Sequence, residues 1–272
     1  MKLKQPLGIL PCVASALVAS AFFAQQASAD DDSELAKKLQ NPIAALISVP
    51  VKLDWDTGIG SADSDRSTYV IQPVIPISLN DEWNVISRTI LPVYIDAESP
   101  VAGGSDFSGN GDILQSLFFS PKAPTAGGWI WGAGPVFSLP TAGDDALGTE
   151  KFSVGPTAIV LRQENGWTYG GLVNHLWSVG GDDDRDDVSA TFLQPFLSYT
   201  TKSSTTFGIN TESSYNWEVE EWTVPVNLML SQLVKIGQRP LSLQLAYRNY
   251  LDTPTGGPDW GIRFQVTFLF PK

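Results

Sequence analysis

The sequence predicts an all-β protein, a transmembrane antiparallel β-barrel of about twelve strands in an up-and-down meander. Three observations predict it. The N-terminus has the features of a secretory signal peptide, apolar and polar residues alternate along the rest of the chain, and short turns alternate with long loops. Outer-membrane barrels of Gram-negative bacteria combine these three properties. The cell outer membrane is therefore the predicted compartment.

The first 29 residues predict an export signal. Two lysines precede an apolar stretch over residues 7–23, and Ala27-Ser28-Ala29 supplies the small-x-small pattern that signal peptidase cleaves. Residues 1–29 are therefore predicted to be a cleaved signal peptide. Cys12, the only cysteine, lies inside it, so the mature chain has no disulfide to hold a small core together.

The segment that follows predicts a short helix. Residues 30–41 carry Leu35 and Leu39 at helical spacing, together with two lysines. This segment is either a periplasmic tail or a small plug. Residues 42–272 are the predicted barrel domain.

Composition excludes several classes of protein. The chain has 29 acidic and 17 basic residues and a net charge of −12, which disfavours nucleic-acid binding because phosphate contacts need a basic surface. Beyond the signal peptide no apolar run reaches 18 residues, so no helical membrane span is predicted. Nine Trp, thirteen Phe and seven Tyr are enough to form aromatic girdles at two membrane interfaces. No phosphate-binding, nucleophile-elbow or zinc motif occurs, and no cofactor is expected.

The alternation is clearest in the last predicted strand. Apolar residues occupy every second position from Ile262 to Phe270, with Arg263, Gln265 and Thr267 between them. One face of this strand suits lipid and the other suits water. The predicted strands lie near residues 45–56, 67–78, 83–94, 111–120, 129–139, 152–162, 167–179, 188–199, 205–215, 222–234, 241–250 and 260–270.

The connections differ in length and charge. Tight turns at 79–82, 163–166 and 201–204 alternate with longer loops that hold most of the acidic residues, whereas Lys122 and Lys202 lie in or beside short turns. We expect the acidic loops to face the outside, near lipid and lipopolysaccharide, and the short turns to face the periplasm. Eight prolines fall inside predicted strands and are interpreted as bulges or rim positions.

The predicted inward faces collect polar residues that define a candidate lumen. If Arg88, Arg248 and Arg263 line an open route, they favour anionic solutes. The alternative is a set of salt bridges that fills a small barrel. The candidate lumen residues are Lys52, Asp54, Arg88, Gln115, Gln194, Glu212, Gln244, Arg248 and Arg263.

Two other groups of residues contain side chains of the types used in catalysis or metal binding. His175, the only histidine, could serve a barrel-wall lipid hydrolase, but neither Asn174 nor Ser178 shares its face on a strand, which favours a girdle histidine beside Trp177. Asp182, Asp184 and Asp186 are spaced as in a calcium loop, yet the glycine and the bidentate glutamate of that motif are missing. A solvated outer loop is the favoured interpretation of this run, and no metal site is predicted.

Several segments resemble one bacterial family, that of the meta-pathway phenol-degradation proteins, also described as transporters. The resemblance implies an outer-membrane barrel that admits hydrophobic or aromatic compounds, and it implies no catalytic residues. The segments that carry it are Leu39–Pro42, Gln72–Pro76, Ile86–Pro92, Gly111–Ile113, Phe118–Pro121, Gly148–Lys151, Asn174–Ser178, Leu193–Phe196 and Phe268–Lys272.

The last strand also predicts a partner. Asp259, Gly261, Phe264 and Val266 fit the pattern that the barrel-assembly machinery recognises, although Pro271 and Lys272 follow the final aromatic residue. Three functional hypotheses remain open. They are a channel or transporter for small molecules, a lipid-hydrolysing enzyme that uses His175, and a non-conducting barrel locked by salt bridges of Lys52, Arg88, Asp54 and Glu212.

Overall fold

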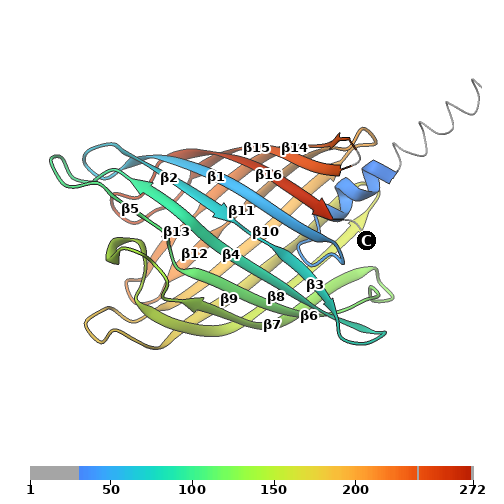
Figure 1. Cartoon of the computed structure of the whole chain (residues 1–272), viewed down its shortest axis with the longest axis horizontal. Coiled ribbons are helices and arrows are strands. Elements are labelled where there is room, and N and C mark those ends of the chain that lie inside the picture. Colours follow the sequence, from blue (N-terminus) through green and yellow to red (C-terminus); the bar gives the residue numbers. More distant parts are fainter. Residues whose placement is uncertain (1–30, 238, 271–272) are drawn as a thin grey trace, which may run out of the picture.

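The computed structural model describes residues 31–237 and 239–270, and the predicted signal peptide lies outside this range. Its strands form one antiparallel sheet that closes on itself, as Figure 1 shows. The first strand, β1 (Ile47–Ile59), pairs with the last, β16 (Trp260–Phe270), over eleven residue pairs from Ile47 with Phe270 to Thr57 with Trp260. The fold is therefore a closed barrel, and the twelve predicted strands are confirmed.

Four of the twelve wall strands are interrupted once, so the wall contains sixteen strand segments. The interrupted wall strands are β2 with β3, β5 with β6, β11 with β12, and β13 with β14. The bounds of the remaining segments are β2 (Ser64–Ile71), β3 (Val74–Ser78), β4 (Trp83–Ala97), β5 (Phe107–Gly109), β6 (Ile113–Pro121), β7 (Trp129–Leu139), β8 (Lys151–Glu164), β9 (Trp167–Gly181), β10 (Ser189–Thr200), β11 (Thr205–Thr211), β12 (Ser213–Asn216), β13 (Glu221–Thr223), β14 (Pro225–Ile236) and β15 (Arg239–Tyr250).

The prolines occupy gaps in the ladder as well as bulges. Pro92 lies where the β2–β4 register shifts, as predicted. Pro135 and Pro156 instead pair with each other in the middle of β7 and β8, where a bulge or rim position was expected. On their far sides the β6–β7 and β8–β9 ladders each skip two residue pairs without changing register. A proline has no N–H to donate, so it fits where the neighbouring strand needs none.

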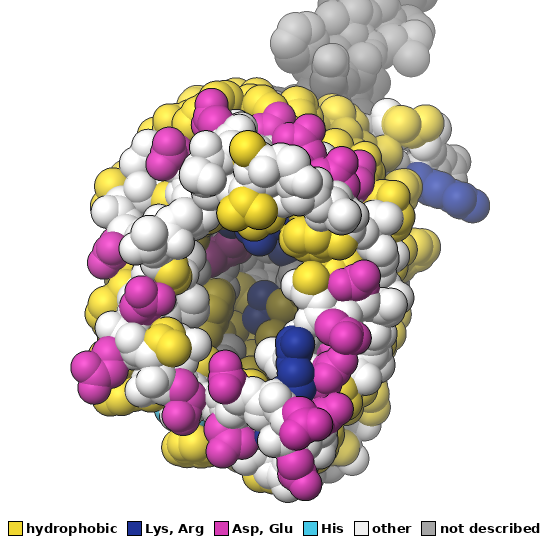
Figure 2. All heavy atoms as spheres, turned by 90° about the vertical axis from the view of Figure 1, so that its left-hand side faces the viewer, with side chains coloured by type: hydrophobic (Ala, Val, Ile, Leu, Met, Phe, Trp, Pro, Cys, Tyr) yellow, Lys and Arg dark blue, Asp and Glu magenta, His cyan; other side chains and the backbone are white. Residues whose placement is uncertain are grey.

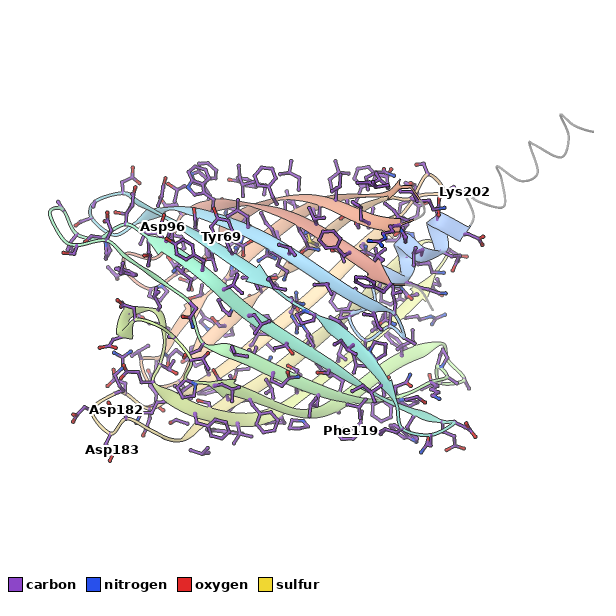
Figure 3. The ribbon with its side chains drawn as sticks, viewed as in Figure 1. Tyr69, Asp96, Phe119, Asp182, Asp183 and Lys202 are labelled. Atoms are coloured by element: carbon purple, nitrogen blue, oxygen red, sulfur yellow. The ribbon has the colours of Figure 1, made fainter. Side chains whose placement is uncertain are left out.

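The two ends of the barrel differ as the sequence indicated. Figure 3 places Asp96, Asp182 and Asp183 at the end with the long loops and Lys202 at the end with the short turns. Aromatic pairs surround the wall near both ends. Trp129 and Tyr169, with ring centroids 6.0 Å apart, lie toward the short turns, and Trp55 and Trp260, 5.5 Å apart, lie toward the long loops. These rings form the two girdles expected of a membrane barrel.

A short helix over residues 31–39 lies at the short-turn end (Figure 1). Its Ala36 is buried against Leu233 and Leu269 of the wall. Asp32 pairs with Lys235 at 2.5 Å, and the Gln163 side chain donates a hydrogen bond of 2.7 Å to a backbone carbonyl of the helix. We call residues 31–46 the N-terminal plug. No helix within the described residues is long and apolar enough to cross a membrane.

Candidate functional site in the barrel lumen

Strand pairing determines which side chains face the lumen. Asp54 on β1 pairs with Arg263 on β16, and Arg263 in turn pairs with Ala246 on β15. Side chains two residues apart share a face, so Lys52 and Arg248 point the same way. Eight of the nine predicted lumen residues lie on this inward face: Lys52, Asp54, Arg88, Gln194, Glu212, Gln244, Arg248 and Arg263.

Gln115 is the exception, because it lies on the outward face of β6. It pairs with Thr89, whose hydroxyl donates a 2.6 Å hydrogen bond to its side-chain oxygen. Its neighbour Ser116 is the residue that faces inward, opposite Arg88. The prediction was wrong because Phe118 and Phe119 are adjacent and both apolar, so alternation in this strand does not distinguish the two faces.

Arg263 is the centre of a buried ion-pair network. Its Nε and Nη2 donate to the two oxygens of Asp54 at 2.6 and 2.8 Å. Its Nη1 and Nη2 also donate to the two oxygens of Glu212 at 2.9 and 3.0 Å. The two bidentate pairs use four of the five N–H donors of the guanidinium. The carboxylates of Asp54 and Glu212 therefore neutralise Arg263, which adds no unpaired positive charge to the lumen.

A second arginine extends this network toward the long loops. Arg248 Nη1 lies 2.8 Å from Asp54 and 3.6 Å from Asp56, and the Tyr250 hydroxyl donates to Asp56 at 2.9 Å. Arg66 lies 3.4 Å from the other oxygen of Asp56. The two aspartates are thus shared among three arginines, and they hold β1, β2, β15 and β16 together along the inside of the wall.

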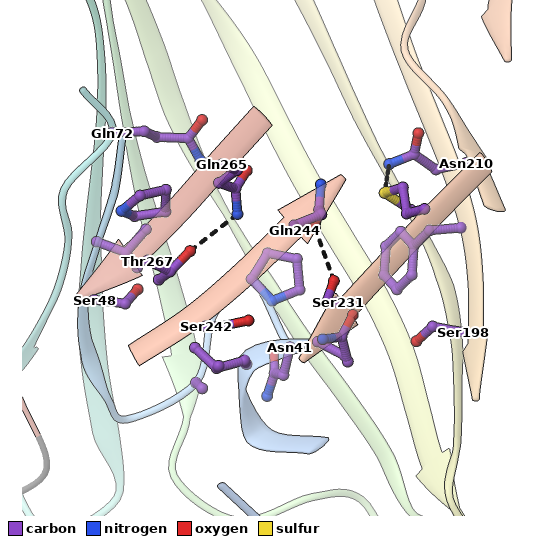
Figure 4. Close-up of a pocket in the computed structure, with 18 of the residues that line it drawn as sticks. Asn41, Ser48, Gln72, Ser198, Asn210, Ser231, Ser242, Gln244, Gln265 and Thr267 are labelled. Atoms are coloured by element: carbon purple, nitrogen blue, oxygen red, sulfur yellow. Dashed lines mark hydrogen bonds between the residues drawn. The ribbon is translucent and has the colours of Figure 1, made fainter. Parts of the chain in front are cut away.

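A cavity of about 190 Å³ lies between this network and the N-terminal plug. Figure 4 shows polar side chains from many strands around it, among them Gln72, Asn210 and Gln265, with Asn41 of the plug below. Gln244 accepts a 3.2 Å hydrogen bond from Ser231, and Gln265 donates one of 3.0 Å to Thr267. Uncharged hydrogen-bonding residues are therefore the largest group in the cavity wall, which also contains apolar and charged residues.

Two basic residues that line the cavity have no acidic partner. Lys52 donates a single side-chain hydrogen bond, 2.7 Å long, to Gln72 Oε1. The Arg88 side chain is 8% exposed, its Nε has no hydrogen-bond partner, and no ion pair joins it to any described residue. The salt bridges proposed for these two residues in a locked barrel are thus not formed, and Asp54 and Glu212 bind Arg263 instead.

The opposite side of the lumen is apolar, which the sequence analysis missed. Ile86 pairs with Phe118, and Ile159 pairs with Leu172, on the inward faces of neighbouring strands. We call the following set the apolar luminal cluster. It comprises Ile43, Val74, Ile86, Phe118, Ile159, Leu161 and Leu172, with Ile130, Phe192 and Phe196 packed against it. The signal was present in runs such as 158–161, where apolar residues are continuous rather than alternating, as in strands covered on both faces.

The N-terminal plug inserts one residue into this cluster. Asn41 Oδ1 accepts a 3.0 Å hydrogen bond from the backbone of Ile43, which turns the chain inward after the helix. Ile43 is only 4% exposed. A Cβ atom on Gly132 would lie 3.2 Å from Ile43 Cδ1, so the absence of a side chain there makes room for it. The plug is thus fixed by apolar packing on one side of the lumen.

His175 lies on the outward face of β9, away from the lumen. Its Nδ1 is 2.7 Å from Thr191 Oγ1, and its ring centroid is 4.0 Å from that of Trp177. Trp217 Nε1 also donates to Thr191 Oγ1, at 2.8 Å. His175 Nε2 is buried without a hydrogen-bond partner. A histidine and a hydroxyl are adjacent here, but among the described residues no third polar group is hydrogen-bonded to the ring, as nucleophilic catalysis requires.

The acidic run in the outer loops is held by an arginine. Arg185 donates hydrogen bonds of 2.9 and 2.7 Å to the backbone oxygens of Asp145 and Gly148, and lies 3.7 Å from Glu150. A side-chain hydrogen bond with Asp145 raises the pKa of the Glu150 carboxyl. Asp182 accepts from the backbone of Asp184, and within the described range no three acidic or histidine side chains converge as metal ligands would.

Figure 2 views the barrel from the long-loop end. Acidic side chains surround the rim, and a hollow opens in the middle with Lys and Arg side chains visible inside it. The lumen is therefore open at the long-loop end, and the N-terminal plug lies at the other end (Figure 1). A solute that entered here would pass an acidic rim before it reached basic side chains.

Comparisons with known proteins bear on the fold. No protein-family model matches this chain, and no curated protein matches it. An outer membrane channel from Pseudomonas putida F1 is similar in structure, with a TM-score of 0.65 and 15% identity over 83% of this chain and 96% of that chain. The β-domain of the Bordetella autotransporter BrkA covers 83% of this chain and 100% of its own, with a TM-score of 0.44 and 12% identity. Outer membrane phospholipase A from Escherichia coli covers 86% and 98%, with the same TM-score and identity.

The fold and the lumen define the class of protein: an outer-membrane β-barrel. The structural likeness to the Pseudomonas putida channel is a likeness of fold at 15% identity. The predicted compartment, the outer membrane, is confirmed. The resemblance to the phenol-degradation family stays a prediction.

Proposed function

We propose that this chain is an outer-membrane channel through which small solutes pass, and that these solutes include hydrophobic or aromatic compounds. The observation that carries the proposal is the two-sided lumen. Charged and amide groups line β1, β15 and β16, whereas the apolar luminal cluster covers the strands from β3 to β10, which also carry Arg88 and Gln194 on their inward face. A solute with both a polar group and an apolar body finds complementary surfaces on opposite sides of one passage.

Two further features support passage over a sealed barrel. The lumen is hollow at the long-loop end (Figure 2), and the cavity of about 190 Å³ lies beneath it. The plug that bounds the cavity is a single short segment held by the inserted Ile43, by packing of Ala36 and Leu46 against Leu233 and Leu269, by one ion pair and by one side-chain hydrogen bond to the helix. Displacing these contacts breaks no strand pairing of the wall, so the plug is the movable part.

The non-conducting alternative is favoured by the Arg263 network, which fills part of the lumen with fixed charge. Liposome swelling separates the two hypotheses. Purified protein is reconstituted with sugars, amino acids or aromatic acids as the test solutes. We expect swelling, fastest for solutes that carry an apolar ring. Liposomes that swell no faster than protein-free ones, together with planar-bilayer currents at baseline, would reject the channel.

The enzyme alternative has one observation in its favour, the 2.7 Å contact between His175 and Thr191. His175→Ala and Thr191→Val are assayed for phospholipid hydrolysis alongside the unchanged protein. A channel shows no hydrolysis in any of the three and unchanged swelling rates in all. Hydrolysis that is present in the unchanged protein and lost in both variants would establish an enzyme instead.

A further inference from the structure

Arg88 is a buried cation that forms no ion pair with any described residue, and its Nε has no hydrogen-bond partner among them. It lines the luminal cavity and is only 8% exposed. Five N–H donors in so enclosed a position are costly unless something accepts from them. Water in a polar cavity can accept from them, and an anion satisfies them better because the guanidinium fork matches a carboxylate.

Lys52 lines the same cavity as Arg88. Its ammonium group donates to the neutral Gln72 amide at 2.7 Å and forms no direct ion pair with a described carboxylate. Four basic residues line the cavity, Lys38, Lys52, Arg88 and Arg263, against a single acidic one, Glu212. Both oxygens of that glutamate are already bound by Arg263. The cavity therefore has an excess of positive charge in a chain whose net charge is −12.

We propose that the luminal cavity is a binding site for a small organic carboxylate, held by Arg88 and Lys52. The inference rests on the proposed channel function and names its solute class. Arg88 supplies a two-pronged contact to the carboxylate, and Lys52 supplies the second charge. Arg248 and Arg263, which the sequence analysis grouped with Arg88, take no part because aspartates and Glu212 neutralise them.

The remaining lining explains why the ligand is organic. Val74 pairs with Arg88 in the β3–β4 register and also belongs to the apolar luminal cluster, so an apolar surface begins beside the guanidinium. Phe196, Met229 and Leu46 line the same cavity. A cavity of about 150 Å³ is enough for a benzene ring, so about 190 Å³ holds a carboxylate on a body of roughly that size.

The test uses the full chain, purified in detergent, with benzoate as the probe. Isothermal titration is run with benzoate, benzyl alcohol, benzylamine and inorganic phosphate. We expect benzoate to bind and each of the other three to bind at least tenfold more weakly. Equal affinity for benzyl alcohol would overturn the role of the charge. Equal affinity for inorganic phosphate would show that the organic body of the ligand does not contribute to binding. A preference for benzylamine would contradict the carboxylate site altogether.

Single substitutions test whether Arg88 and Lys52 supply the positive charge that binds benzoate. Arg88→Gln and Lys52→Gln are each expected to weaken benzoate on the order of tenfold or more, since hydrogen bonds to charged groups are strong. Arg162→Gln is the matched control, because Arg162 pairs with Glu164 at 2.6 Å away from the lumen. Unchanged affinity in Arg88→Gln, with normal heat-modifiable migration on gels, would contradict the assignment. If that variant fails to fold, the four-ligand comparison on the unchanged protein decides.

Failure of this inference is distinguishable from failure of the channel. Reversal potentials are measured across planar bilayers in a gradient of sodium benzoate. Current without benzoate binding or anion preference would refute the carboxylate site and leave the channel intact. Benzoate binding without any current would refute the channel and leave the carboxylate site intact.

Discussion

Arg263 binds Asp54 through two hydrogen bonds, at 2.6 and 2.8 Å, across the seam where the last strand of the barrel meets the first. Both residues are more than nine-tenths buried. Closure of the barrel therefore places a bidentate ion pair inside the wall where chain ends 209 residues apart come together. The same aspartate also holds Arg248, so one carboxylate serves three adjacent strands.

Replacing Asp54 with Asn should destabilise the barrel. The change leaves Arg263 with Glu212 alone and Arg248 with the more distant Asp56, and breaking a buried pair costs about 3–5 kcal/mol when a charge is left unpaired. We expect a value of about 3 kcal/mol, because Glu212 still compensates Arg263. The measurement is the temperature at which folded, fast-migrating protein is lost on gels.

The matched control is Glu164→Gln, which removes one partner of an ion pair that is about 40% exposed at the carboxylate. Exposed pairs contribute about 0–1 kcal/mol, so its transition temperature should stay near that of the unchanged protein. Equal shifts in the two variants would show that the seam pair has no special part in closure.

Replacing Ile43 with Ala should loosen the plug. Ile43 is the residue through which residues 31–46 enter the apolar luminal cluster, and deleting a buried isoleucine side chain to alanine costs about 2–5 kcal/mol. We expect the open state to become at least tenfold more populated, read as the mean conductance of single channels in planar bilayers.

Ile236→Ala is the control for this change, because Ile236 is 69% exposed and lies beside a short turn of the wall. The same substitution there should leave conductance unaltered. If Ile43→Ala conducts like the unchanged protein while both variants are folded, the N-terminal plug is not the part that limits the current.

Removing the Arg185 side chain should free the outer loops. Arg185 links the loop before β10 to the backbone of Asp145 and Gly148 and also lies 3.7 Å from the Glu150 carboxylate. We expect Arg185→Ala to be cut several-fold faster by an added protease at the long-loop end, with an unchanged thermal transition. Asp183→Ala, in the same loop, should be cut at the original rate; faster cleavage there too would point to charge rather than to the Arg185 contacts.

The sequence was a good guide to the wall and a partial guide to the lumen. Alternation and turn chemistry are local, so β7 and β16 have the predicted bounds, and the acidic and basic ends separate as expected. The identity of ion-pair partners is not local. Asp54 and Arg263 are adjacent only because the barrel closes, and Glu212 binds Arg263 rather than Arg88. No spacing in the chain records either relationship.

Gln115 on β6 and Gln244 on β15 lie on opposite faces of the barrel wall. Gln115 contacts Thr89, Ser87 and the backbone on the outer surface, whereas Gln244 lines the luminal cavity. Gln115→Leu exchanges hydrogen bonds for apolar contact with lipid, so its stability should change by about 1 kcal/mol or less, and its conductance should not change. Gln244→Leu is the reverse case, since it removes a polar group from the passage and should alter single-channel conductance without altering the lipid-facing surface. Equal conductance changes in both variants would place Gln115 in the lumen after all and reverse the face assigned to β6.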